Sequence, residues 1–493
     1  MPLYFRYLIR RARRVAIPAA LIFSFLVLAL FLVVFVFGVP RSAILGVVPL
    51  PLKRAAHGVV DQLWDWSIRV RDLPYAVYRF RESPLPVYDL VIGEQKLDEL
   101  DAYYQAHAAD YERVKDYKSA KFFADGEEYD VRVSYRGEGD IHFAYDKKSW
   151  RVRFPSDHYF HGMKSINLII PEDRLFIGEY FNNYRAKKLG VPVPESDFAV
   201  LRVNGKSSGV YFVIEQPSGA FLEKAKFSPD ANLYGEDTAS GLIWSDVSLW
   251  QKFSENPQSP PDDFSDLAEL LELLAHPSDE YFWLHIPTLV DMGAFFRWQA
   301  HAALSGSPHQ DAFHNARLYF DPTIGKFKFI PWDVYIRPLD YIGVPEQGMD
   351  FIDYNPLVQR ILKNPEYLEQ RNRILWEYVR DDRNLEEDLA WYDEKYDRVR
   401  LAFYQDTAKR YPNSAFRRTS RETRQVIAAN FRGLRDLLQH AAVGVLPRLN
   451  LPASHNTRTF TPIQAAIDIE VKALAPQRIS RLEIRDLPAA APT

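Results

Sequence analysis

The sequence predicts an α+β fold in two parts, the first rich in strands and the second helical, behind an apolar N-terminal segment. Before about Gln216, short runs alternate apolar and polar residues, as half-buried strands do. After it, apolar residues recur mainly at helical spacing. Residues 15–39 carry no charged side chain. A chain of 493 residues with this organisation is expected to form about two or three domains.

We expect the chain to be divided into six segments. Pro84 and Pro86 mark the boundary at which the main folded part begins. The segments are a basic tail (1–14), a transmembrane anchor (15–39), a juxtamembrane segment (40–84), a strand-rich part (85–216), a helical part (217–445) and C-terminal strands (446–493). Because two strands alone are not stable, the last segment either pairs with the main domain or begins a further β-module.

The uncharged segment at 15–39 predicts a membrane anchor. As a helix it would extend roughly 37 Å at 1.5 Å per residue, which is enough to cross a bilayer. Five arginines and no acid precede it, so the N-terminus is expected in the cytoplasm. The sequence therefore predicts a single-pass protein of a bacterial inner or plasma membrane, with a periplasmic or extracellular main domain. Aromatic and basic residues at 59–79 suit either the membrane interface or a helix packed on the next domain.

The amino-acid composition excludes several kinds of functional site. The chain contains no cysteine, which excludes disulfides, cysteine–zinc sites and thiol catalysis. Its formal net charge is −4, so nothing in the overall charge indicates a nucleic-acid partner.

The segment 307–338 contains the candidate site. Residues 317–320 and 326–330 have strand patterns, and Asp-Pro-Thr-Ile-Gly between them has turn chemistry, so a hairpin is expected. Asp311 and Asn315 precede the first strand, and Asp333 follows the second. In an antiparallel pair the start of one strand lies beside the end of the next. The three side chains are therefore predicted at one end of the hairpin.

Two carboxylates and a carboxamide suit a hard cation such as Mg²⁺, which takes oxygen ligands and shares them with phosphates. One of the three could instead act as a base toward a hydroxyl, as in protein kinases. Asp and Asn also cap elements and form turns next to strands, so the spacing alone leaves both interpretations open.

The segment, together with pieces upstream, resembles the CotH family, the spore-coat-protein-H-like atypical protein kinases. The resemblance covers roughly residues 85–400 and depends on the order and spacing of short motifs. These are Tyr135-Arg136-Gly137, the Lys-Lys-Ser-Trp-Arg-Val-Arg-Phe run at 147–154, Ile-Asn-Leu at 166–168, Leu-Gly-Val-Pro-Val-Pro at 189–194, Val-Asn-Gly at 203–205, Gly-Val-Tyr-Phe-Val-Ile-Glu at 209–215, Asp311-x-x-His314-Asn315 and Phe-Ile-Pro-Trp-Asp at 329–333.

The resemblance implies a two-lobed, atypical protein-kinase-like fold, with a strand-rich N-lobe and a helical C-lobe. It implies phosphate transfer from ATP to protein Ser or Thr, with Mg²⁺, or Mn²⁺ in its place. Asp311 would be the catalytic residue, and Asn315 and Asp333 would hold the metal. The nucleotide would be bound by Arg136, Lys148, Glu179 and Glu215, with Glu179 as the partner of Lys148.

One departure from the family favours a second hypothesis. The Arg-Gly turn is usually continued by serines, and Glu138 and Asp140 stand there instead. Acids beside a triphosphate are unfavourable unless a cation offsets them. The alternative is a kinase-fold protein without phosphotransfer that acts as an envelope structural or assembly factor. The expected partners are the membrane and either a protein substrate or an envelope protein. A weaker third hypothesis is metal-dependent phosphoester hydrolysis at the same site.

Overall fold

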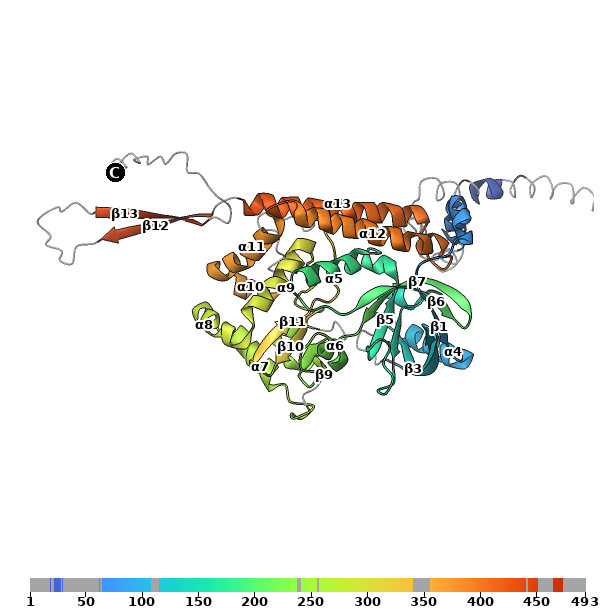
Figure 1. Ribbon diagram of the computed structural model, residues 1–493, viewed down its shortest axis with the longest axis horizontal. Coiled ribbons are helices and arrows are strands. Elements are labelled where there is room, and N and C mark those ends of the chain that lie inside the picture. Colours follow the sequence, from blue (N-terminus) through green and yellow to red (C-terminus); the bar gives the residue numbers. More distant parts are fainter. Residues whose placement is uncertain are drawn as a thin grey trace, which may run out of the picture. The chain divides into compact units, whose positions relative to one another are not determined.

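The computed structural model describes residues 18, 22–27, 29, 62, 64–107, 115–137, 139–236, 241–254, 257–339 and 355–439, and the backbone of two strands at 442–450 and 464–472 (Figure 1). The chain divides into two compact units. Unit 1 consists of Met1–Ile177, Pro194–Gln216 and Asp393–Thr423, and unit 2 of Gly178–Val193, Pro217–Tyr392 and Arg424–Thr493. Helices are found in both units, and the mixed α+β class is confirmed.

A closed barrel of seven strands forms the centre of unit 1, in the order β1-β2-β3-β4-β5-β7-β6. The strands are β1 (Val87–Val91), β2 (Lys118–Ala124), β3 (Glu127–Tyr135), β4 (Trp150–Arg153), β5 (Ser165–Ile169), β6 (Ser196–Val203) and β7 (Lys206–Glu215). Neighbours pair antiparallel, except that β1 and β6 pair in parallel and close the barrel. Apolar side chains fill the interior, among them Leu90, Val133 and Leu168, which are fully buried.

Helical segments cover the barrel of unit 1. They are α4 (Glu94–Ala106), three 3₁₀ segments (η2, Leu73–Phe80; η3, Asp140–His142; η4, Pro171–Arg174) and parts of α12 (Arg383–Gln405) and α13 (Asn413–Leu438). The aromatic–basic segment at 64–80 is packed within this unit. Trp64 Nε1 donates to the carbonyl oxygen of Arg410 at 3.3 Å, and the rings of Tyr75 and Tyr404 lie 4.8 Å apart. Of the two expectations for this segment, the structure shows a helix packed on a folded domain.

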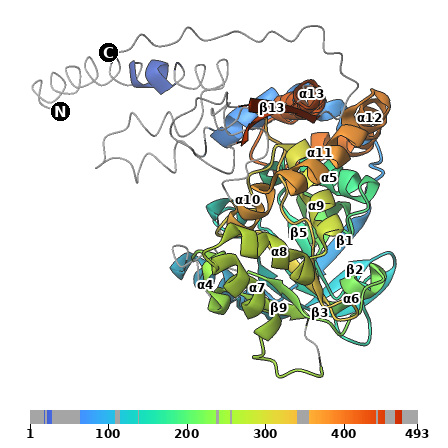
Figure 2. The ribbon, with the colours of Figure 1, turned by 90° about the vertical axis from the view of Figure 1, so that its left-hand side faces the viewer.

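Unit 2 combines helices with a four-stranded sheet in the order β11-β10-β8-β9. Its strands are β8 (Leu233–Gly235), β9 (Gln251–Ser254), β10 (Arg317–Asp321) and β11 (Lys326–Phe329). Its helices are α5 (Gly178–Lys188), α6 (Gly219–Lys224), α7 (Ser265–Ala275), α8 (Asp279–Leu289), α9 (Met292–Ser305), α10 (Pro356–Leu362), α11 (Pro365–Val379) and the remainder of α12 and α13, with 3₁₀ turns at η5 (Ile243–Ser245) and η6 (Val247–Leu249). Figure 2 shows α7 and α8 following one another beside β9.

Two helix boundaries are set by the backbone and by tertiary contacts. The helix α5 begins only at Gly178, because Leu175 and Phe176 take the left-handed conformation, with φ of 50° and 61°. The helices α8 and α9 do not merge into one helix. They are separated at Val290, which pairs with Phe327 as an isolated bridge, and Asp291 caps the start of α9 by accepting from Ala294 N at 3.0 Å. At Val290, pairing with a residue distant in sequence thus outweighs the local tendency to continue the helix.

A two-stranded hairpin lies near the C-terminus. β13 (Gln464–Lys472) contains the predicted strand at 466–471, and its partner β12 (Ala442–Asn450) was not expected as a strand. The second predicted strand, at 479–484, lies outside the described residues.

The predicted single-pass membrane anchor, and the inner-membrane localisation derived from it, are wrong by the structural criterion. Of residues 15–39, the structure describes 18, 22–27 and 29, and the others lie outside the described residues, as does the basic tail at 1–14. No helix in the described part of the chain is long and apolar enough to cross a membrane.

Candidate active site

The candidate site is built on the hairpin of β10 and β11, which forms as predicted. Its turn is set by local chemistry. Asp321 Oδ1 accepts hydrogen bonds from the backbone nitrogen of Thr323 at 3.0 Å and from its hydroxyl at 2.6 Å. Gly325 takes a φ of +65°, which costs glycine little. The two strands therefore emerge from the turn in a fixed register.

The loops before and after this hairpin are fastened to each other. Gln310 Nε2 donates to the carbonyl oxygen of Trp332 at 2.8 Å. At the end of α9, Gly306 has a φ of +63°, and a Cβ there would lie 2.2 Å from the carbonyl oxygen of Arg337. Only glycine allows this close approach of the two chain segments.

Asn315 and Asp333 meet at a common neighbour, His309. Asn315 Nδ2 donates to the carbonyl oxygen of His309 at 3.0 Å and lies 3.1 Å from its Nδ1. The same Nδ1 lies 3.0 Å from the carbonyl oxygen of Asp333 and 3.5 Å from its Oδ2. The His309 ring stacks on Tyr335 at 4.2 Å, which fixes its plane. The structure thus brings the two predicted metal ligands to one imidazole.

Asp311 lies in the adjoining turn and is engaged locally. Its Oδ1 accepts from the backbone nitrogens of Phe313 and His314 at 2.8 and 3.0 Å, and lies 3.0 Å from His314 Nδ1. The hydrogen bond that Asp311 accepts from the His314 ring raises the pKa of His314. The rings of His314 and His309 are 4.9 Å apart, so the turn of Asp311 adjoins the Asn315–Asp333 pair through two histidines.

Both Asn315 and Asp333 have left-handed backbone conformations, with φ of 64° and 56°. Residues other than glycine rarely adopt this region, and such strain gathers at functional sites because the surrounding structure must hold it. Two such residues at one imidazole indicate that the positions of both side chains are held for a purpose beyond chain reversal.

A buried ion pair between Glu236 and Arg317 lies next to Asn315 and holds its backbone. Glu236, at the end of β8, accepts from the backbone nitrogen of Asn315 at 2.6 Å and pairs with Arg317 at 2.8 Å. Both partners of the ion pair are buried, with 5% and 4% exposed. Burial raises the pKa of Glu236, and the charge of Arg317 opposes that rise. The sheet thereby holds the backbone of Asn315 in its unusual conformation.

The donor set fits Mg²⁺ of the kind that shares its coordination with phosphates. Asn315 and Asp333 supply a carboxamide and a carboxylate, which are hard oxygen donors, and Mg²⁺ in such sites takes one or two protein ligands with phosphate oxygens and water. In the part of the chain that the structure describes, no group of three or more His, Cys, Asp or Glu could hold a metal by itself. A metal here would therefore need a ligand such as a nucleotide to complete its coordination.

Comparison with known proteins agrees with this geometry. A family described as "CotH kinase protein" matches residues 133–430, which is more than half of the chain and includes the hairpin. The chain belongs to the CotH family. It is also similar to the inner spore coat protein H of Bacillus subtilis strain 168, with 26% identity over 305 residues, covering 60% of this chain and 81% of that protein. The resemblance seen in the sequence is confirmed.

The nucleotide-binding residues predicted from the CotH resemblance are divided between the units: Arg136, Lys148 and Glu215 belong to unit 1 and Glu179 to unit 2. Lys148 Nζ donates to the carbonyl oxygen of Phe143 at 2.7 Å and pairs with Asp101 at 3.1 Å. The acid that it contacts in the structure is thus on α4, and its pairing with Glu179 stays a prediction.

Glu179 and Glu215 are both buried carboxylates. Glu179 lies in the first turn of α5, where the helix N-terminus favours a negative charge, and is 5% exposed. Glu215 ends β7, is fully buried, and accepts from the backbone nitrogen of Glu195 at 3.3 Å. The assignment of both residues to nucleotide binding stays a prediction.

Packing against a neighbouring side chain explains why the Arg-Gly turn contains glycine at position 137. Gly137 has a φ of +93°, and a Cβ there would lie 2.2 Å from the ring of His142. The backbone nitrogen of Arg136 donates to the carbonyl oxygen of Ser149 at 3.0 Å, which ties the turn to the start of β4. Of the two acids that distinguish this turn, Glu138 lies outside the described residues.

Sequence reasoning missed His309 and Glu236. His309 lies two residues before Asp311, inside the segment already singled out, so its sequence position was a usable signal. Glu236 is 79 residues from Asn315 and on another strand, so no local pattern connects the two.

Proposed function

We propose that this CotH-family protein is an atypical kinase that transfers phosphate from a nucleotide to Ser or Thr of a protein, with Mg²⁺ at Asn315 and Asp333. The observation that carries the proposal is the pair of left-handed residues, Asn315 and Asp333, meeting at His309 beside the turn of Asp311. Asp311 would accept the proton of the acceptor hydroxyl. The metal would neutralise phosphate charge. The kinase-like two-lobed arrangement is part of this proposal.

Support for the assignment of roles comes from the hydrogen bonds. Asp333 and Asn315 share a neighbour and can share a cation, whereas Asp311 is engaged in a separate turn. The Oδ1 of Asp311 holds local bonds, and its Oδ2 would be the oxygen that accepts the proton of the hydroxyl. This division corresponds to a metal-holding pair and a base that stands apart.

The test is to titrate the full chain with ATP, with and without Mg²⁺ or Mn²⁺, and to follow melting, binding heat and phosphate transfer to the chain itself and to Ser/Thr-containing peptides. Asp333→Asn is expected to weaken Mg²⁺–ATP binding by about tenfold or more, because a charged contact contributes roughly 1.5–3 kcal/mol. Asp311→Asn is expected to keep ATP binding and lose transfer.

Asp262→Asn is the matched control, because Asp262 is an exposed acid of unit 2 outside the site. It should leave binding and transfer unchanged. Unchanged Mg²⁺–ATP affinity in Asp333→Asn would refute the metal assignment, and transfer retained in Asp311→Asn would refute the role of the base.

A second candidate function is that of a non-catalytic assembly protein. Two observations favour it: the Oδ1 of Asp311 is taken up by its own turn, and the similar protein from Bacillus subtilis is named as a component of the inner spore coat. This alternative predicts that ATP and Mg²⁺ shift neither the melting temperature nor any partner binding. It also predicts that Asp333→Asn behaves like the Asp262→Asn control throughout.

A further inference from the structure

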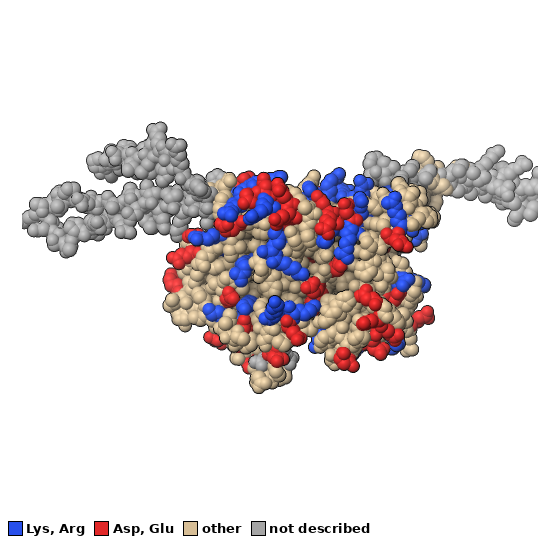
Figure 3. All heavy atoms as spheres, viewed as in Figure 1, with Lys and Arg blue, Asp and Glu red and all other residues tan. Residues whose placement is uncertain are grey.

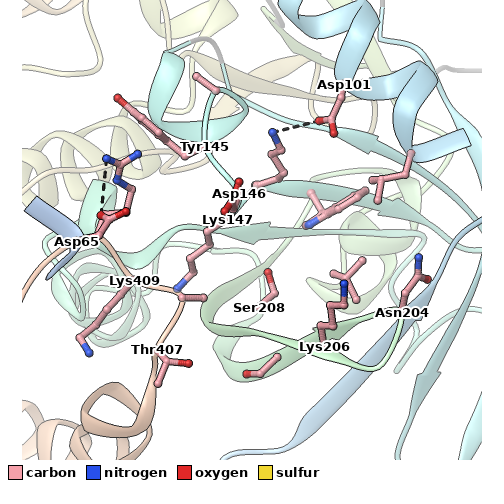
Figure 4. Close-up of a pocket in the computed structure, with 18 of the residues that line it drawn as sticks. Asp65, Asp101, Tyr145, Asp146, Lys147, Asn204, Lys206, Ser208, Thr407 and Lys409 are labelled. Carbon is pink, nitrogen blue, oxygen red and sulfur yellow. Dashed lines mark ion pairs between the residues drawn. The ribbon is translucent and has the colours of Figure 1, made fainter. Parts of the chain in front are cut away.

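A cavity of about 930 Å³ opens at one mouth of the barrel in unit 1 (Figure 4). The barrel topology explains its position. Because β1 and β6 are parallel and their other neighbours antiparallel, the ends of β3 and β6 and the starts of β4 and β7 lie at the same mouth. The cavity is lined there by Tyr135, Trp150, Val203 and Lys206, one from each of these strand termini. Barrel mouths are frequent ligand sites.

One wall of the cavity is held by a buried ion pair. Lys147 Nζ pairs with Asp406 Oδ2 at 2.7 Å, and the two side chains are 3% and 0% exposed. The same carboxylate accepts from the backbone nitrogen of Val210 at 3.0 Å, and also from those of Ala408 and Lys409. The 407–410 loop is therefore fastened to the start of β7, and the wall exists before any ligand binds.

Some of the cationic side chains that line the cavity form ion pairs with acids, and others do not. Its six cationic side chains are Arg69, Lys147, Lys148, Lys206, Lys409 and Arg410. Four of them pair with an acid: Lys147 with Asp406, Lys148 with Asp101, Lys409 with Asp72, and Arg410 more loosely with Asp65 at 4.0 Å. Arg69 and Lys206 have no ion pair or hydrogen bond from their side chains to other described residues.

Two acids in the lining, Glu94 and Asp146, also have no ion pair or side-chain hydrogen bond within the described residues. Figure 4 shows Lys206 and Ser208 on the β6–β7 hairpin and Asp146 on the loop across the cavity. Ser207 and Thr407 add hydroxyl donors on the side of Lys206 and the 407–410 loop. The cavity thus offers free groups of both signs, at separated positions, together with hydroxyls.

We propose that this cavity binds a small zwitterion, with an oxyanion held by Lys206 and an amine held by Asp146, which lie across the cavity from each other. A ligand with one charge would leave the opposite group without a partner, whereas a zwitterion satisfies both. The paired cations keep their own acids, so only the free groups are available for recognition. The proposal does not depend on the kinase proposal, because Lys206 and Asp146 belong to unit 1 and neither is among the predicted metal, catalytic or nucleotide-binding residues. Lys148, which is one of those predicted residues, also lines the cavity but keeps Asp101 as its partner.

Long-range attraction is not expected to select the ligand. The chain has a net charge of −4, and basic and acidic side chains are interspersed on the face shown in Figure 3. Selection therefore rests on contacts inside the cavity. The oxyanion can be a carboxylate or a phosphate, since both accept hydrogen bonds from lysine, arginine and hydroxyls.

The experiment is calorimetric titration of the full chain with β-alanine and with O-phosphoethanolamine, which pair an amine with a carboxylate and with a phosphate. Acetate, inorganic phosphate and ethanolamine are the single-charge references. At least one zwitterion is expected to bind up to about fivefold more tightly than each of its references, because a contact between exposed charges contributes about 1 kcal/mol or less. Which zwitterion binds better distinguishes the two oxyanions.

Lys206→Gln and Asp146→Asn are each expected to weaken that binding by up to about fivefold, for the same reason. Lys164→Gln and Asp98→Asn are the matched controls, because both residues are exposed, belong to unit 1 and lie outside the lining. All four positions are exposed, so melting temperatures near that of the unchanged chain confirm that the variants fold. No binding of either zwitterion at millimolar concentration would overturn the proposal. So would equal affinity for a single-charge reference, or equal affinity in the cavity variants and the controls.

Discussion

Unit 1 and unit 2 each contain a carboxylate that lies close to backbone in the left-handed conformation. The kind of residue that takes this conformation differs between the two units. In unit 1 the left-handed residue is Gly209, with a φ of +87°, and a Cβ there would lie 2.2 Å from Asp406 Oδ1. In unit 2 the left-handed residues are Asn315 and Asp333 themselves. Glycine adopts this conformation without strain, whereas a residue with a side chain requires support from its surroundings.

The carboxylates of Asp406 and Asp333 also differ in the groups that they contact. Asp406 is fully buried and is satisfied by Lys147 and three backbone nitrogens. Asp333 is directed toward an imidazole, with its Oδ2 3.5 Å from His309 Nδ1. The difference teaches that a buried, saturated acid next to glycine holds the fold. In our proposal, the strained acid beside the His309 ring is instead held in place for chemistry. Three substitutions test this distinction.

The largest effect is expected from Asp406→Ala. Removing this acid leaves Lys147 buried without a counter-charge and three backbone nitrogens without an acceptor. The free energy of unfolding should fall by about 3–5 kcal/mol, as for other buried pairs that lose one partner. Denaturant unfolding of the full chain measures it.

Asp89→Ala is the comparison for that variant. Asp89 pairs with Arg202 on the surface of the same barrel, with 28% and 48% of the side chains exposed. Exposed pairs contribute about 1 kcal/mol or less. Equal losses in the two variants would contradict the structural role given to Asp406.

A second effect, somewhat smaller, concerns pH. Burial raises the pKa of Glu172 to about 7, and the nearby charge of Lys147 opposes the rise. The folded chain therefore binds this proton more tightly than the unfolded chain does. The unfolding free energy should fall as pH rises from about 4.5 to 7, by about 3 kcal/mol for this group at most.

Glu172→Gln should remove that dependence, so the variant gains stability relative to the unchanged chain between pH 5 and pH 8. Glu82→Gln, at an exposed acid of the same unit, should show no such trend. A stability difference between Glu172→Gln and the unchanged chain that stays constant with pH would show that the carboxyl group titrates normally.

The smallest effect on stability is expected at the site itself, from Asp333→Gly. Glycine relieves the left-handed strain but adds freedom to the unfolded chain, and the two contributions nearly cancel. The unfolding free energy should change by about 1 kcal/mol or less, without loss of fold. If the unfolding free energy falls by more than about 2 kcal/mol, Asp333 stabilises the fold as Asp406 does, and the distinction between the two acids is wrong.

Local patterns were sufficient for the hairpin and for much of the site. The turn at Asp321 and Gly325 uses side chains within five residues of each other, so its register follows from neighbouring positions. The same is true of the short motifs by which the CotH family was recognised. For this reason Asp311, Asn315 and Asp333 could be selected, and Asn315 and Asp333 do meet, at His309.

What the sequence by itself determined is therefore the family, the α+β class and the position of the candidate site along the chain. Only the tertiary structure decided how the strands close, which acid each buried cation meets, and which residues hold the site in place. The parallel pairing of β1 with β6 joins residues more than 100 positions apart, and Lys147 meets Asp406 across 259 positions. Such contacts depend on the packing of the whole unit, because no local periodicity or turn chemistry brings residues so distant in sequence together.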